Sequence, residues 1–162
     1  IPFDVKFPAQ ASILKEGVAL GRLEIINHGY SHCIIGSHLP RLFTSNRQFH
    51  REFWDYLDES IHESHLQESQ STLARIFGKI PETFAPPGNV YSEKTIKFFS
   101  KFGISRCHSS RYVQCETANY EYIDFEKSCV FHCKDINDHG LKYLERILLN
   151  NSSNTYKFVG EM

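Results

Sequence analysis

The sequence lacks several features, and each absence argues against a class of protein. No apolar run approaches the roughly 18 residues that a membrane-spanning helix needs. The 18 basic and 19 acidic side chains leave a net charge of −1, so no broad positive field attracts nucleic acid. The first residues lack the basic start and the apolar stretch of a signal peptide. We therefore expect a soluble globular domain with no membrane span and no nucleic-acid partner; its oligomeric state is not indicated.

Cysteine pairs with the spacing of a metal ribbon are also lacking. The five cysteines are an odd number and include no Cys-x-x-Cys pair, which argues against a fully paired secreted framework and against a zinc ribbon. We expect buried, reduced thiols, which favours a reducing compartment and hence a cytoplasmic location. The residues are Cys33, Cys107, Cys115, Cys129 and Cys133.

What the sequence does contain is an alternation of short apolar strands with amphipathic helices, without internal repeats. Residues 1–162 suit a single domain. The alternation predicts an α/β fold with a mostly parallel sheet, in which ligands bind at the carboxyl ends of the strands. Helices are expected over 9–20, 44–77 (with a break), 92–103 and 138–149, and strands in the first residues and over 23–26, 82–85, 104–107 and 129–131.

A polar cluster, Asn27-His28-Gly29-Tyr30-Ser31-His32, begins directly after the strand predicted over 23–26. Two histidines separated by three residues lie on one face if the backbone turns helically, so that His28 and His32 can bind one metal ion. The chain has nine histidines, so a chance pair at this spacing is an equally good explanation. The position directly after a strand favours the metal site.

Two further candidate sites also follow predicted strands. Pro86-Pro87-Gly88 combines a rigid backbone with a glycine that a ligand can approach closely, and a plain loop is the alternative. His132 emerges from the apolar strand predicted over 129–131. It is either an acid–base residue or a histidine whose hydrogen bonds are satisfied within the core.

Together these segments resemble the polysaccharide deacetylases, a family of metal-dependent carbohydrate esterases. Residues 24–32 look like the family's metal-binding histidine motif, 78–88 like its groove-lining motif, and 130–132 like its late Leu-x-His motif. Gly29 stands where a hydroxyl residue is common, and Ala85 stands where the groove-lining arginine would be. The resemblance covers most of the chain.

The resemblance implies an irregular or partial (β/α) barrel and the removal of acetyl groups from a saccharide substrate. It implies that His28 and His32 hold a divalent metal, for which zinc is best suited, with cobalt, nickel or iron also tolerated. His132 would be the general acid, and the segment 86–88 would line the substrate groove with its glycine amide facing the oxyanion. Because related enzymes are often exported, a periplasmic or exported location is the alternative to a cytoplasmic one.

The family's first strand carries an Asp-Asp pair, and no such pair occurs here. Asp4 is the nearest candidate, but it lies only 24 positions before His28, an interval into which the family fits a further helix and strand. We therefore expect that Asp4 is not the catalytic aspartate and that the domain is truncated at its N-terminus, without the first strand. A non-catalytic carbohydrate-binding module of the same fold is the alternative, and a plain α/β domain with incidental histidines is a third hypothesis.

Two more histidines, His62 and His65, lie three residues apart on a predicted helix. With Glu63 they could mimic a second metal site, but the flanking Glu59 and Glu68 favour a solvated helix face. We expect both imidazoles to face water.

Overall fold

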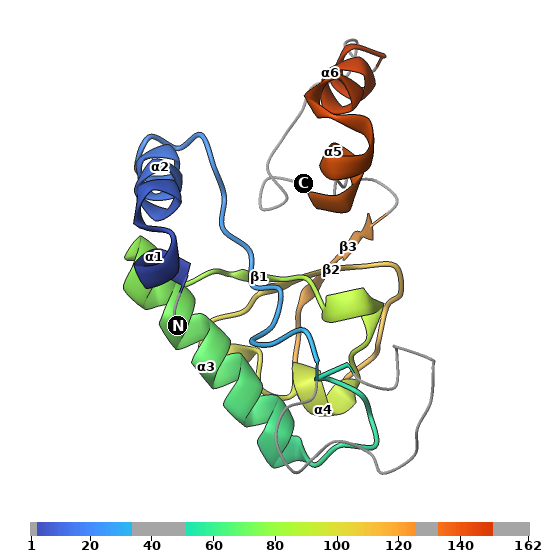
Figure 1. Ribbon diagram of the computed structural model, residues 1–162. Coiled ribbons are helices and arrows are strands. Elements are labelled where there is room, and N and C mark those ends of the chain that lie inside the picture. Colours follow the sequence, from blue (N-terminus) through green and yellow to red (C-terminus); the bar gives the residue numbers. More distant parts are fainter. Residues whose placement is uncertain (1–2, 34–50, 126–132, 151–162) are drawn as a thin grey trace.

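Three parallel strands form the centre of the fold and lie in the order in which they occur along the chain (Figure 1). The computed structural model describes residues 3–33, 51–125 and 133–150. The strands are β1 (Thr83–Phe84), β2 (Arg106–Ser109) and β3 (Glu121–Asp124). The register aligns Phe84 with Cys107 and Ser109 with Asp124, so the carboxyl ends of the strands lie at one edge of the sheet.

A fourth extended segment lies beside β1, on the side away from β2. The Asn27 amide donates to the Thr83 carbonyl (2.9 Å), and the Ala85 amide donates to the Asn27 carbonyl (2.8 Å). These two bonds form a single parallel bridge between Asn27 and Phe84. The strand predicted over 23–26 is therefore reduced to one paired residue at its carboxyl end.

Helices precede, connect and follow these strands. α3 (Glu59–Phe77) ends at Gly78, whose φ of +71° is the left-handed conformation that glycine adopts easily. α3 is the crossover between two parallel neighbours, the Asn27 segment and β1, as parallel pairing requires. The other helices are α1 (Phe3–Lys6), α2 (Pro8–Ala19), η3 (Pro87–Asn89), α4 (Glu93–Ile96), η4 (Ser100–Phe102), α5 (Cys133–His139) and α6 (Leu141–Asn150).

Several predicted boundaries differ from the structure. The strand expected in the first residues is the helix α1, and residues 51–58, expected to be helical, form turns before α3 begins. β3 was not predicted, because its tyrosine-rich surroundings hide the alternation of a strand. Gly140, at φ +71°, divides the helix expected over 138–149 into α5 and α6. The strand expected over 129–131 lies outside the described residues.

The main core lies between the sheet and the helices α3 and α4. The Phe84 ring on β1 is fully buried and packs edge-on against Phe53 (centroids 5.2 Å apart) and Phe99 (5.6 Å). Burial of a side chain of this size stabilises the fold by about 1.5–3 kcal/mol. The cluster comprises Phe53, Leu66, Phe84, Tyr91, Ile96, Phe99, Ile104 and Cys107.

Three of the cysteines, Cys33, Cys107 and Cys115, are free thiols. Cys107 is buried in the core, as expected, and burial raises the pKa of its thiol to about 12. Cys33 is exposed and Cys115 is partly exposed, so the expectation of buried thiols is wrong for these two. Exposure arises because both residues lie in loops rather than in strands.

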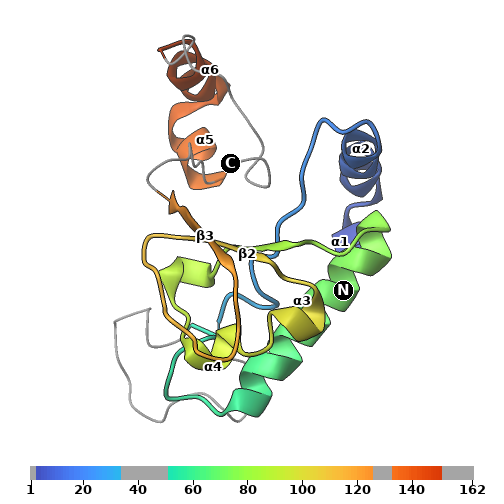
Figure 2. The same ribbon diagram turned by 180° about the vertical axis from the view of Figure 1, so that it is seen from behind.

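Figures 1 and 2 show α1 and α2 beside the C-terminal end of α3, whereas α5 and α6 lie beyond the end of β3. An ion pair between Arg75 and Asp4 (2.7 Å) joins α3 to α1. Within the described ranges, the helices include none with the length and apolar character needed to cross a membrane.

Candidate functional site

The candidate site lies at the carboxyl edge of the sheet, where two loops follow adjacent strands. Residues 28–32 follow the Asn27 bridge, and residues 86–88 follow β1. The loops are in contact, since a Cβ atom on Gly29 would lie 2.9 Å from Cγ of Pro87. This edge is where parallel α/β sheets bind ligands. The structure therefore brings together two of the segments that the sequence singled out.

His28 is exposed at this edge, and its ring is oriented by the backbone. Its Nδ1 lies 2.7 Å from the carbonyl oxygen of Ala85. A carbonyl can only accept, so Nδ1 carries the proton and Nε2 of the neutral ring keeps its lone pair. Histidines that bind metals typically donate their other ring N–H to a carbonyl or carboxylate in this way.

His32 lies beside His28, with the ring centroids 5.0 Å apart and the rings inclined by 61°. A tetrahedral zinc ion with Zn–N distances of about 2.0–2.1 Å would place two imidazole centres about 5 Å apart. Burial, the Arg51 cation and His28 lower the pKa of His32, which favours the neutral imidazole that metals bind. The two side chains thus fit a divalent ion in donor type and in spacing.

The Arg51 guanidinium lies between the two loops. Its Nη1 contacts Nδ1 of His32 and donates to the His32 carbonyl (3.3 Å). A Cβ atom on Gly88 would lie 2.6 Å from Nε of Arg51, so the close approach that this glycine permits is made by arginine. Since a guanidinium only donates, Nδ1 of His32 acts as an acceptor here, and metal binding through this ring requires the guanidinium to move.

A buried carboxylate lies beneath the histidine loop. Glu52 is 0 % exposed and accepts hydrogen bonds from three consecutive backbone amides: Tyr30 (3.1 Å), Ser31 (3.2 Å) and His32 (2.9 Å). His65 on α3 adds a fourth, with Nδ1 2.6 Å from Oε2. These four bonds offset the cost of burying the charge.

Asn27 anchors the start of the same loop. Its fully buried amide group donates to Ser69 Oγ (2.8 Å) and Gln70 Oε1 (3.1 Å) on α3, and its Oδ1 accepts from the Gly29 amide (2.8 Å). The side chain thus ties the carboxyl end of the extended segment to the helix that covers the sheet. The position of His28 relative to the sheet follows from this anchor.

The second loop, residues 86–88, is mostly buried, although the sequence predicted that it lines a substrate groove. Pro86 and Pro87 are buried, and Gly88 is exposed with a φ of +62°. Of the three residues expected to bind substrate, only Gly88 is exposed, and the Arg51 side chain lies against it. His132, the expected general acid, lies outside the described residues.

Comparison with known proteins decides the family. The model of glycosyl hydrolase family 57 matches residues 10–129, which is about three quarters of the chain. The chain belongs to glycosyl hydrolase family 57. The polysaccharide deacetylase family expected from the motifs is thus not the family shown; what the two families have in common is an action on carbohydrates. No curated protein matches the chain.

A solved structure shows the same fold. The family 57 chain matches the structure of IcaB from Ammonifex degensii with a TM-score of 0.53 and 14% identity, over 81% of this chain and 51% of IcaB. The chain therefore spans about half the length of that protein. The match and the parallel sheet confirm the expected fold class, an α/β partial barrel with parallel strands.

Among the described residues, carboxylate and thiol ligands are sparse around the histidine pair of this family 57 chain. The described ranges contain no cluster of three or more His, Cys, Asp or Glu side chains that could hold a metal. Asp4 is bound by both terminal nitrogens of Arg75 (2.7 and 3.0 Å), away from the carboxyl edge. Asp124 ends β3 at that edge and partly offsets the effect of burial, which lowers the pKa of His108.

The expectation that His62 and His65 face water is wrong, because both are buried. His62 bonds to Thr95 Oγ1 (2.9 Å) and to the Trp54 carbonyl (3.2 Å), and His65 bonds to Glu52. Their acidic neighbours stay outside the core, since Glu59 and Glu68 are exposed and Glu63 is partly exposed. A signal was present in the sequence: His62, His65, Ser69 and Gln70 recur at helical spacing, a polar stripe that becomes buried because each member has a partner.

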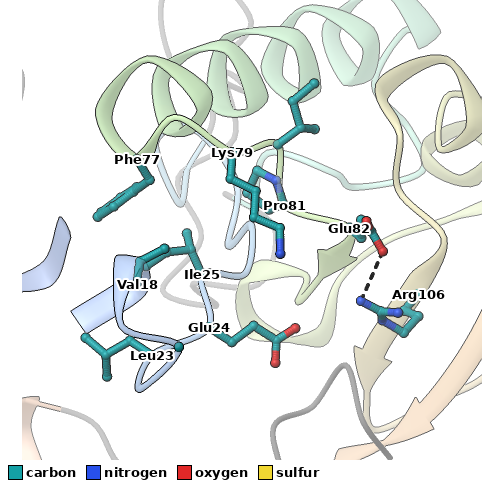
Figure 3. A pocket seen from close by; sticks show the side chains of 11 residues that line it. Val18, Leu23, Glu24, Ile25, Phe77, Lys79, Pro81, Glu82 and Arg106 are labelled. Atoms are coloured by element: carbon teal, nitrogen blue, oxygen red, sulfur yellow. Dashed lines mark hydrogen bonds and ion pairs between the residues drawn. The ribbon is translucent and has the colours of Figure 1, made fainter. Parts of the chain in front are cut away.

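A cavity of about 270 Å³ lies at the opposite edge of the sheet (Figure 3). Figure 3 shows apolar Val18, Leu23 and Phe77 on one side of it and the Glu82–Arg106 ion pair on the other. The residues that line it precede β1 and begin β2, so this cavity is separate from the histidine pair.

Proposed function

We propose that this family 57 chain carries the metal-binding histidines of a hydrolase that removes acetyl groups from a saccharide, with zinc as the preferred ion. One observation carries the proposal: His28 and His32 lie 5.0 Å apart at the carboxyl edge of a parallel sheet, and His28 is oriented by the Ala85 carbonyl. The resemblance of residues 24–32 to a deacetylase motif supports the same reaction. Since the chain spans half of its structural neighbour, this activity is proposed for the whole protein.

The chain's own residues would contribute binding, orientation and proton transfer. His28 would bind the ion through Nε2 while Ala85 holds its other nitrogen, and His32 would bind in its neutral form after Arg51 moves aside. The ion would supply Lewis-acid activation of water and of the acetyl carbonyl. The exposed Gly88 amide would stabilise negative charge on the carbonyl oxygen, and His132 would donate a proton to the departing sugar.

Hydrolysis of a glycosidic bond is the second candidate, and membership of family 57 favours it. This reaction ordinarily uses two carboxyl groups on either side of the scissile bond. Among the described residues, Glu52 is buried and accepts four hydrogen bonds, so it is not free to act as a nucleophile or an acid. Asp124, the last residue of β3, places a carboxylate at the carboxyl edge of the sheet, where this reaction would need one.

The two reactions give different products from one substrate. We would incubate the purified protein, with and without Zn²⁺, with an acetylated chito-oligosaccharide, an acetylated xylo-oligosaccharide and their deacetylated forms. Free acetate and new reducing ends would be measured in parallel. The proposal predicts Zn²⁺-dependent acetate release without chain cleavage, and the ratio between the two substrates distinguishes N- from O-deacetylation.

Variants assign the activity to the site. His28→Ala and His32→Ala are expected to lose bound zinc and acetate release together, whereas His139→Ala, an exposed histidine on α5, should retain both. New reducing ends without acetate would favour the glycosidase instead. Saccharide binding without either product would favour a non-catalytic binding module, and absence of stoichiometric metal in the wild-type protein would overturn the deacetylase proposal.

A further inference from the structure

We propose that Glu52, held in place by His65, is the positioning residue that shapes the loop of residues 28–32 into a metal-binding conformation. The metal is that of the proposed function, on which this inference rests. Neither residue lies within residues 24–32. In the part of the chain that the structure describes, neither forms a hydrogen bond with the imidazole of His28 or His32. Both act on the loop backbone.

The contacts of Glu52 are those of a carboxylate that organises a turn. Oε2 accepts from the amides of Tyr30 and Ser31, and Oε1 accepts from the amide of His32. All three amides donate and the carboxylate oxygens accept. Successive amides that converge on one anion form a concave turn, and here the anion belongs to the protein itself. The loop is therefore wrapped around Glu52 rather than around a ligand.

The loop adopts backbone angles that need such support. His32 has a φ of +63°, a left-handed conformation that a residue with a side chain adopts at an energetic cost. Conformations of this kind persist where the surroundings determine them, and the bond from the His32 amide to Oε1 (2.9 Å) is such a constraint. Without the carboxylate, we expect His32 to relax and its ring to leave the 5.0 Å separation from His28.

His65 completes the arrangement from α3. Its Nδ1–H donates to Oε2 at 2.6 Å, and its ring lies edge-on to Tyr30 with centroids 5.8 Å apart. The helix thereby fixes both the carboxylate and one residue of the loop. His62, one turn earlier on the same helix, is equally buried but bonds to Thr95 and Trp54 instead, so it is a matched control that does not touch the loop.

The test compares four single variants of the whole chain. Glu52→Gln keeps the volume but places an NH₂ group where an acceptor oxygen lies. His65→Leu removes the donor, His65→Asn retains an N–H near the Nδ1 position, and His62→Gln perturbs the same helix elsewhere. Far-ultraviolet circular dichroism and a cooperative thermal transition establish that each variant folds.

Two readouts separate the inference from the function on which it rests. Hydrogen exchange of the amides of residues 30–32, followed by NMR without metal, reports the loop itself. Competition with a chromophoric chelator reports Zn²⁺ affinity. Glu52→Gln and His65→Leu should accelerate exchange of these amides at least tenfold and weaken Zn²⁺ binding roughly 10–100-fold. His65→Asn and His62→Gln should stay within about threefold of wild type in both.

Each outcome bears on one hypothesis. Wild-type exchange rates in folded Glu52→Gln, or equal effects of His62→Gln and His65→Leu, would overturn the positioning role. If Glu52→Gln does not fold, the comparison of His65→Leu with His65→Asn decides the same question. Failure of the wild-type chain to bind Zn²⁺ would overturn the proposed function while leaving the exchange result interpretable.

Discussion

The carboxylate of Glu52 occupies the space that a side chain on residue 29 would need. A Cβ atom built on Gly29 would lie 2.1 Å from Oε1 of Glu52, well inside van der Waals contact. The φ of Gly29 is +82°, which also favours glycine. The departure from the deacetylase motif at this position, glycine in place of a hydroxyl residue, therefore has a physical cause in a residue more than 20 positions away.

Replacement of Gly29 by alanine should destabilise the chain more than the same change at Gly78. Both glycines have positive φ, but a Cβ on Gly78 meets no atom within 4 Å. We expect Gly78→Ala to cost about 1 kcal/mol from backbone strain alone and Gly29→Ala to cost roughly 2–4 kcal/mol, because Glu52 must also shift. Urea unfolding measures both free-energy changes. Equal destabilisation of the two variants would show that Glu52 moves away from residue 29 at no energetic cost.

Stability should fall with decreasing pH because of His62. Burial lowers the pKa of this imidazole from 6.5 to about 4, so the unfolded chain takes up the proton first as the pH falls. Stability is then lost between pH 6.5 and about 4, at up to about 1.4 kcal/mol per pH unit and about 3 kcal/mol in all. In His62→Gln, urea unfolding at pH 7 and pH 5 should show a smaller difference than in wild type; an unchanged difference would contradict the assignment.

Asp4→Asn should leave zinc content and turnover unchanged. The carboxylate is bound by Arg75, whose hydrogen bonds lower the pKa of Asp4, and it lies away from the histidine pair. Metal analysis by mass spectrometry, with His28→Ala as the positive control for metal loss, checks this expectation. Loss of zinc from Asp4→Asn would instead make Asp4 a ligand.

His132→Ala should slow acetate release by roughly 10²–10⁴-fold without loss of zinc, if this histidine is the general acid of the proposed deacetylase. Acetate production under saturating substrate and the zinc content of the same sample are the two measurements. A variant that loses its metal would show that His132 acts as a ligand rather than as an acid.

Local patterns predicted much of the fold. Alternating strands and helices indicated a parallel α/β sheet, and the helix predicted to end at residue 77 does end there, because Gly78 adopts a positive φ at little cost. The spacing of His28 and His32, directly after an extended segment, indicated a metal site at the carboxyl edge. Predictions failed where the signal was short or ambiguous, as for α1, which was expected to be a strand, and for β3, which was missed.

The sequence by itself therefore determined the alternation of parallel strands with helices, the edge at which the loops meet and the residues of the histidine pair. Only the tertiary structure decided which buried polar groups support that pair. Glu52, His65 and Arg51 lie in no local pattern with the loop: α3 brings His65 to it, and the turns that precede α3 bring Arg51 and Glu52. A buried charged group needs hydrogen-bond partners, and these can come from segments that are distant in sequence. A local sequence pattern therefore does not predict which residues they are.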